Sequence, residues 1–180
     1  MSDSEKLKPE ADLLLLTLVR HGEALPLDEM VHRTDFNRPL TDRGRQQARW
    51  LGARIHGYGP FEMILVSQAL RTTQTWQLME IAESLGVNPF FEEEAYLAGR
   101  KTLQRLIGKL LEKSPEGKPK RILLVGHNPG ISHLLEYLSG CDEGLGTADS
   151  AILSIKEQDW QVALEGESLW HLSGLIRNPY

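Results

Sequence analysis

The chain has 180 residues, of which 41% are hydrophobic and 25% are charged, so we expect one folded domain and exclude a wholly disordered chain. Its 20 Lys and Arg residues against 25 Asp and Glu residues give a net charge of -5, which argues against a general affinity for nucleic acid or for anionic membranes. The single cysteine, Cys141, excludes an intramolecular disulfide and a cysteine-rich zinc site, and it fits a reducing compartment.

The first twelve residues differ in character from the rest of the chain. They carry mixed charge and lack the basic start and small-residue cleavage site of a signal peptide. The apolar run that follows, from Leu13 to Val19, is far shorter than the ~20 residues that a membrane-spanning helix needs. We therefore expect a cytoplasmic protein with a flexible N-terminal arm over residues 1–12 and a single domain over residues 13–180.

Short apolar runs without alternation predict strands that are covered on both faces. Such runs occur at residues 13–19, 63–66, 90–91 and 121–125. Two later runs, 151–155 and 161–164, predict a closing pair of strands, which we interpret as a hairpin.

Between the strands, apolar residues recur at helical spacing. Thr41 offers an N-cap for a first helix that buries residues 44, 48, 51 and 55. Further helices are predicted from residues 78, 81, 82 and 85, with a cap at Gly86; from residues 103–111; and from residues 131–138, ended by Gly140. Strands that alternate with helices predict an α/β fold, a three-layer α/β/α sandwich around a mostly parallel sheet.

In open parallel sheets, ligands bind beyond the carboxyl ends of the strands. Arg20 and His21 follow the first predicted strand, Arg71 follows the second, and His127 follows the strand at 121–125. Arginines hold phosphoryl groups through forked hydrogen bonds, a neutral imidazole is a competent nucleophile for phosphorus, and helix N-termini add N–H donors. Gly22 would let the backbone approach such a group closely. The sequence therefore predicts a site that binds and transfers a phosphoryl group.

The same residues carry a resemblance to a known family. The segment Leu-Val-Arg-His-Gly-Glu-Ala at 18–24 resembles the signature of the histidine phosphatase superfamily, the phosphoglycerate-mutase-like enzymes. Segments 38–44, 67–75 and 125–130 resemble that superfamily's motifs for the start of its first helix, its second arginine and its second histidine. The order and spacing agree over residues 13–140. The short length, without an inserted cap domain, is most similar to the small phosphohistidine phosphatases of the SixA branch.

The resemblance implies a role for each residue. His21 would be the nucleophile that becomes transiently phosphorylated, and Arg20, Arg71 and His127 would surround the phosphoryl oxygens. It also implies a phosphoglycerate-mutase-like fold, chemistry without metal or cofactor, and a substrate that is a phosphorylated histidine on a signalling protein. Positioning and charge supply most of the rate in phosphoryl transfer, and two guanidinium groups should lower the pKa of His21.

The proton donor is an open question in the sequence. Of three consecutive glutamates, Glu94 lies where the superfamily places the acid that protonates an alkoxide leaving group. The alternative is that residues 92–94 form a solvated turn. The resemblance to phosphohistidine phosphatases implies that no strong acid is needed, because the phosphorus–nitrogen bond is labile.

Other interpretations remain at this stage. The substrate is either a phosphohistidine-bearing protein or a small phosphate ester such as a nucleotide or sugar phosphate. A catalytically idle phosphate-binding module is an alternative of another class, and a metal hydrolase built from His21, Glu23, His127 and His133 is the least favoured. We expect a monomer, with residues 30–38 as a candidate flap over the site.

Overall fold

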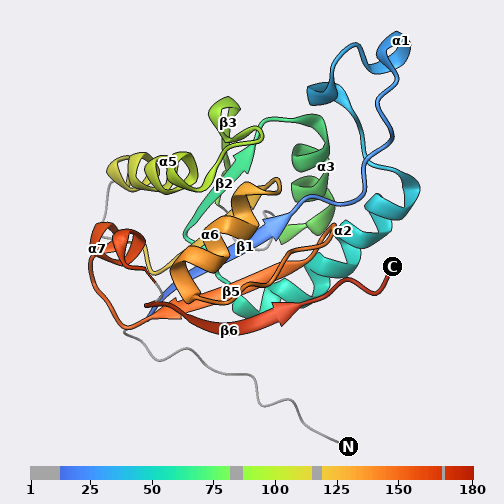
Figure 1. The fold of residues 1–180 in the computed structure, drawn as a ribbon. Coiled ribbons are helices and arrows are strands. Elements are labelled where there is room, and N and C mark those ends of the chain that lie inside the picture. The colour runs from blue at the N-terminus through green and yellow to red at the C-terminus, as the bar shows by residue number, and fades with distance from the viewer. Residues whose placement is uncertain (1–12, 82–86, 115–118, 168) are drawn as a thin grey trace, which may run out of the picture.

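The computed structural model describes residues 13–81, 87–114, 119–167 and 169–180. Within these ranges, one sheet is enclosed by helices on both faces (Figure 1). Its strands are β1 (Leu14–Arg20), β2 (Met63–Ser67), β3 (Phe90–Glu92), β4 (Arg121–Gly126), β5 (Ser150–Ile155) and β6 (His171–Ile176). The helices are α1 (Glu29–His32), α2 (Asp42–Ile55), α3 (Leu70–Met79), α5 (Arg100–Glu112), α6 (Gly130–Ser139) and α7 (Trp160–Glu165), with 3-10 turns η1 (Asp35–Asn37), η2 (His56–Tyr58) and η3 (Glu93–Ala95).

The strand order is β3-β2-β4-β1-β5-β6. Strands β3, β2, β4 and β1 are mutually parallel, β5 is antiparallel to β1, and β6 is antiparallel to β5. Val125 pairs with Val19 on one side and with Val66 on the other, so β1, β4 and β2 end level with one another. The predicted α/β fold with a mostly parallel sheet is confirmed, and the segments that follow these three strands emerge at one edge.

The two helical layers bury opposite faces of the sheet. Leu16 and Leu18 of β1 belong to the core cluster formed with α5, α6 and α7, whereas Val19 belongs to the cluster formed with α2 and α3. Because alternate side chains of a strand point to opposite faces, a strand covered on both sides must be apolar throughout. This explains the unbroken apolar runs of the sequence.

The first predicted helix forms as expected. Thr41 caps α2, its hydroxyl oxygen accepting a 2.9 Å hydrogen bond from the backbone N–H of Gly44. Gly44, Ala48, Leu51 and Ile55 are all buried. Likewise, α6 ends at Gly140, whose φ of 71° is the left-handed conformation that glycine adopts readily.

The predicted strand at 161–164 is wrong. These residues belong to α7, in which Trp160, Ala163 and Leu164 are buried at helical spacing. Asp159 caps the helix by accepting a 2.8 Å hydrogen bond from the N–H of Gln161. A run of four residues is too short for its period to be recognised, and the cap decides the outcome. The strand that follows β5 in the chain and pairs with it is β6.

The helix after β2 forms, but its buried face differs in part from the predicted one. It begins at Leu70 and buries Thr72, Thr75, Trp76 and Met79, and Leu78 is only half-buried. The chain leaves this helix at Glu80, which has a left-handed φ of 55°. Residues 82, 85 and 86 of the predicted face, like the N-terminal arm at 1–12, lie outside the described residues. Because two of the buried positions are threonines, a pattern based on apolar residues alone does not reveal the helical period of this segment.

In the part of the chain that the structure describes, no helix has the length and apolar character required to cross a membrane. The cytoplasmic location and the monomeric state stay predictions from the sequence.

Candidate active site

Three segments that follow neighbouring strands bring the predicted residues together. His21 lies just beyond β1, Arg71 lies in the first turn of α3 beyond β2, and His127 lies between β4 and α6. The ring centroids of His21 and His127 are 5.1 Å apart, and the Nε atom of Arg71 donates to Nε2 of His21 at 3.3 Å. All three side chains are buried. The sheet edge therefore holds two imidazoles and a guanidinium in mutual contact.

The backbone fixes the tautomer of His21. Its Nδ1 atom lies 2.7 Å from the carbonyl oxygen of Gly22, and a carbonyl oxygen only accepts hydrogen bonds. Nδ1 therefore carries the hydrogen, and Nε2 keeps its lone pair. This is the nitrogen that faces Arg71 and the one available for attack on phosphorus.

The site keeps His21 uncharged. Burial lowers the pKa of His21 to about 3, and the charges on Arg71 and Arg20 act in the same direction, while the hydrogen bond to Gly22 opposes them. The sequence predicted the guanidinium effect, but burial is the larger cause. An imidazole with this pKa is neutral, and hence nucleophilic, throughout the physiological range.

His127 is held by a residue that the sequence analysis did not single out. Its Nε2 atom lies 2.8 Å from the hydroxyl of Ser67, the buried last residue of β2. Burial lowers the pKa of His127 to about 2, assisted by neighbouring His21 and Arg71. Ser67 could have been predicted as a site residue from its position at a strand end, four residues before Arg71.

Asp35 occupies the outer edge of the Arg71 guanidinium. The two terminal amino groups of Arg71 donate to the backbone oxygen of Asp35 at 2.7 Å and to its Oδ2 atom at 3.0 Å. The Tyr96 hydroxyl also donates to Oδ2, and Nε of Arg38 lies 2.7 Å from Oδ1. Asp35 lies within the segment predicted as a flap, yet neither it nor Tyr96 was predicted as a site residue.

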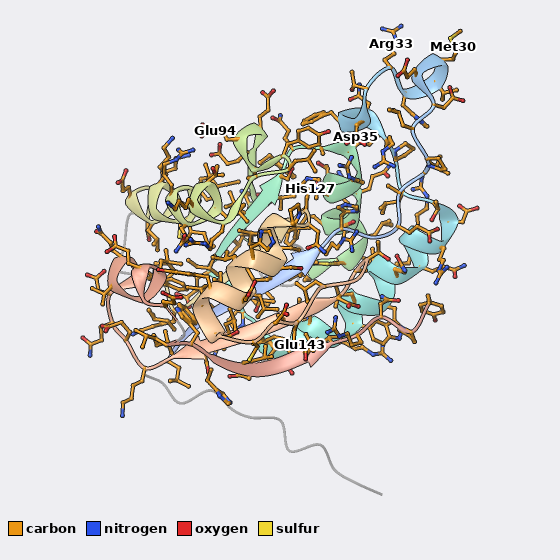
Figure 2. All side chains as sticks on the ribbon, in the orientation of Figure 1. Met30, Arg33, Asp35, Glu94, His127 and Glu143 are labelled. Atoms are coloured by element: carbon orange, nitrogen blue, oxygen red, sulfur yellow. The ribbon has the colours of Figure 1, made fainter. Side chains whose placement is uncertain are left out.

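These contacts keep Asp35 ionised. Its partial burial would raise the pKa of the carboxyl group, but the hydrogen bond from Tyr96 and the charges on Arg71 and Arg38 outweigh it, so the net shift is downward. Figure 2 shows Asp35 on the segment that reaches out towards α1 and returns to the site.

The side chain of Arg20 is held by the loop that contains Leu145. Its Nη1 atom donates at 2.9 Å to the carbonyl oxygen of Leu145, which also accepts from Nδ2 of Asn128 at 2.8 Å. The charge on Arg20 helps to lower the pKa of both His21 and His127, so Arg20 lies near the same cluster. Asn128 thus fixes the position of the carbonyl group to which Arg20 donates.

Gly22 has a different neighbour from the one expected. A Cβ atom at Gly22 would lie 2.6 Å from the carbonyl oxygen of Gly44, and one at Gly44 would lie 2.0 Å from that of Glu23. The backbone that approaches Gly22 is therefore that of the first turn of α2. Two glycines let this helix press against the segment that carries His21.

Glu94 lies outside this cluster. Its side chain is 56% exposed and forms ion pairs with Arg105 at 3.3 Å and Lys109 at 3.6 Å, both on α5. The hydrogen bond from Arg105 and the two charges lower the pKa of Glu94. Figure 2 shows Glu94 at the periphery of the molecule and His127 in its interior.

The described ranges contain no group of three or more His, Cys, Asp and Glu side chains arranged to hold a metal ion. His133, a member of the least favoured sequence-based alternative, is exposed on α6.

Comparison with known proteins defines the class. The family model of the histidine phosphatase superfamily (branch 1) matches residues 16–94, the stretch that contains Arg20, His21 and Arg71. This stretch is less than half of the chain, and over it the sequence is similar to this superfamily of phosphatases, which supports a phosphatase.

Within that class, the structure is similar to proteins assigned as the phosphohistidine phosphatase SixA. The protein from Agrobacterium tumefaciens has a TM-score of 0.71 and 26% identity, covering 91% of this chain and 97% of its own. The one from Nakamurella multipartitia has a TM-score of 0.73 and 21% identity, covering 94% and 99%. The fold expected from the resemblance is thereby confirmed.

Two curated relatives add to this comparison. An uncharacterized chloroplastic protein of Arabidopsis thaliana is 29% identical over 172 residues, covering 89% of this chain and 76% of its own. The mitochondrial serine/threonine-protein phosphatase Pgam5 of Drosophila grimshawi is 37% identical over 75 residues. This match covers 41% of the present chain and only 24% of Pgam5.

Proposed function

We propose that the chain is a metal-independent phosphatase that hydrolyses phosphohistidine on a signalling protein through a phosphorylated His21. The observation that carries the proposal is the hydrogen bond from Nδ1 of His21 to Gly22, which places the hydrogen on Nδ1 and the lone pair on Nε2, the nitrogen that faces Arg71. The reaction class follows from the superfamily, whereas the substrate and the intermediate are our inference.

The reaction has two steps. Nε2 of His21 attacks phosphorus, the phosphorus–nitrogen bond of the substrate breaks, and the phosphoryl group passes to His21. Water then attacks the phosphorus atom on His21, the bond from phosphorus to Nε2 breaks, and inorganic phosphate is released. The proton that water loses leaves with the phosphate or the solvent, and His21 returns to its neutral form. Arg20, Arg71 and His127 would neutralise and orient the phosphoryl oxygens, which supplies most of the rate in transfers of this kind.

The position of Glu94 favours a phosphohistidine over an alkyl ester. An alkoxide needs a proton to leave, whereas imidazole leaves a labile bond without a strong acid. Glu94 is ionised, exposed and paired with Arg105 and Lys109, so it is poorly suited to deliver a proton beside His21. The similarity to SixA proteins supports the same substrate class.

A second candidate is a small phosphate ester, or a phosphorylated hydroxyl group on a protein. The similarity to Pgam5, named as a serine/threonine-protein phosphatase, favours it over the stretch that they share. Hydrolysis of this substrate would pass through the same His21 intermediate and would require a proton donor.

The experiment is a substrate panel with trapping of the intermediate. Wild-type protein is given a phosphohistidine-bearing phosphotransfer protein, phosphoimidazole, phosphoserine and p-nitrophenyl phosphate at matched concentration in the presence of a chelator. We expect turnover that survives the chelator, faster on the two phosphorus–nitrogen substrates, with an acid-labile phosphate on His21 after rapid quenching. Phosphate binding without turnover of any substrate would instead identify the non-catalytic binding module.

A further inference from the structure

Asp35 is placed in the site by four contacts from three other residues, and the steps written above give it no role. Arg71, Arg38 and Tyr96 all bind its carboxylate, and the backbone oxygen of Asp35 binds Arg71 as well. Tyr96 in turn packs edge-on against His127, with ring centroids 5.5 Å apart. The negative charge of this carboxylate repels a phosphoryl group, which the site is expected to bind. Its presence in the site therefore suggests a chemical role.

Arg71 defines where this carboxylate stands relative to the nucleophile. The Nε atom of Arg71 faces Nε2 of His21, whereas its terminal amino groups face Asp35. The guanidinium group therefore separates the nucleophile from the carboxylate. In phosphoryl transfer, the attacking and leaving atoms lie roughly in line on opposite sides of phosphorus. Attack by Nε2 in the direction in which this atom faces Arg71 would therefore direct the leaving group towards the side on which Asp35 stands.

An ionised carboxylate can form a hydrogen bond with a leaving imidazole. When one ring nitrogen of the substrate histidine carries phosphorus, the other nitrogen binds a proton, and the protonated ring leaves as neutral imidazole without any external acid. A carboxylate that accepts this N–H orients the ring and favours its protonated form, as carboxylates do for histidines in metal sites and catalytic triads. A protonated acid at the same position would lack this effect.

We propose that Asp35 is a specificity-determining residue, whose carboxylate accepts the N–H of the leaving imidazole and so selects phosphohistidine over phosphate esters. The inference rests on the proposed function and names the group that recognises its substrate. The incoming phosphoryl oxygens replace Asp35 at the amino groups of Arg71, while Tyr96 and Arg38 retain the carboxylate beside the departing ring. The bond from phosphorus to the substrate nitrogen breaks, the bond to Nε2 of His21 forms, and the proton stays on the departing ring.

The test compares two small substrates and two variants. Phosphoimidazole offers a second ring nitrogen, whereas p-nitrophenyl phosphate has a leaving group that needs no proton and offers no N–H. Asp35→Asn keeps the shape of the side chain and removes its charge. Asp28→Asn is the matched control, because Asp28 is an exposed carboxylate in the same segment that caps α1, and asparagine caps equally well.

For Asp35→Asn, we expect the ratio of kcat/KM on phosphoimidazole to kcat/KM on p-nitrophenyl phosphate to fall about tenfold or more, in line with the loss of a carboxylate partner from a histidine. Asp28→Asn should leave the ratio unchanged. Tyr96→Phe removes only the hydroxyl that holds Asp35, and it should lower the ratio in the same direction by a smaller factor. It serves as the second variant if Asp35→Asn folds poorly.

Two results would overturn the inference. An equal loss on both substrates would make Asp35 a structural anchor, and an equal gain on both would make it only a competitor for Arg71. The wild-type arm reports separately on the proposed function: a chain that cleaves p-nitrophenyl phosphate but not phosphoimidazole has another substrate, whatever the variants do. A substrate methylated on the second ring nitrogen completes the test, because Asp35→Asn should leave its cleavage, relative to p-nitrophenyl phosphate, unchanged.

Discussion

The Nδ1 atom of His21 donates a 2.7 Å hydrogen bond to the carbonyl oxygen of Gly22, the next residue in the chain. A contact between neighbours in the sequence thus orients the ring on which the proposed reaction depends. The opposite nitrogen, Nε2, faces Arg71, and in the proposed reaction it is the nucleophile, which the backbone contact orients before substrate binds.

Replacing His21 should remove turnover. We expect His21→Ala to lower kcat at least about a thousandfold on every substrate, since the variant removes the proposed nucleophile. The acid-labile label should vanish with it. His133→Ala, which removes an exposed histidine of α6, is the control and should retain wild-type turnover. Normal turnover by His21→Ala would disprove the covalent route.

The buried histidines predict a pH-dependent stability. The pKa of His21 is about 3 in the folded protein against 6.5 for an unperturbed ring, so between these values the unfolded chain binds more protons. The free energy of unfolding should therefore fall as the pH drops from about 6.5 towards 3, by about 1.4 kcal/mol per pH unit for this histidine. Above pH 6.5 the contribution of this histidine is constant.

Urea unfolding of the wild type and of His21→Asn at several pH values between 4 and 7 measures this slope. The variant should show a shallower decline by about one proton, and His133→Asn should show none of this change. Identical slopes in all three proteins would mean that His21 titrates normally in the folded state.

Arg71 should not tolerate lysine. Its guanidinium reaches His21 and Asp35 through three different nitrogens, a geometry that a single ammonium group cannot reproduce. We expect Arg71→Lys to lower kcat/KM by about a hundredfold, since each oriented hydrogen bond to developing charge is worth a factor of this order. Arg45→Lys, at a half-buried position of α2 where the side chain pairs with Asp42, should have no effect. The contrast between the two variants in steady-state kinetics is the measurement.

Two helical glycines should respond oppositely to alanine. A Cβ atom at Gly44 would lie 2.0 Å from the carbonyl oxygen of Glu23, so α2 must move away from the segment that carries His21. We expect Gly44→Ala to lower the free energy of unfolding by about 1–3 kcal/mol and to reduce kcat as well. Nothing lies within 4 Å of a Cβ atom at Gly108 of α5, and Gly108→Ala should raise the free energy of unfolding by about 0.5–1 kcal/mol. Thermal and urea denaturation, with an assay on p-nitrophenyl phosphate, separate the two.

Glu94 provides a test of leaving-group chemistry. Because its carboxylate pairs with Arg105 and Lys109 on the exposed side of η3, we expect Glu94→Gln to leave phosphohistidine cleavage within about twofold of wild type. On alkyl phosphates, the family's acid position predicts that this variant abolishes any activity, whereas the outward position of Glu94 in the structure predicts that such activity is retained. Comparing the two substrates in one preparation decides the matter: equal losses on both would show that Glu94 serves the site in another way.

Much of the fold and part of the site could be predicted from the sequence because they depend on local patterns. Unbroken apolar runs predicted the buried strands, the Thr41 cap predicted the start of α2, and Gly140 predicted the end of α6. The pattern failed where it was short, as in α7, or where threonines take core positions, as in α3. In both helices, packing against the rest of the chain replaces the apolar period as the deciding factor.

The sequence by itself determined which residues follow the strand ends, and hence that Arg20, His21, Arg71 and His127 would gather at one edge of a parallel sheet. Only the tertiary structure decided the rest. It turned Glu94 outward onto α5, set Ser67 against His127, and brought Asp35 and Tyr96 to the guanidinium of Arg71 from segments 36 and 25 residues away. Contacts of this kind have no local signature, because they depend on how loops fold back over a sheet and on which buried charges must find a partner.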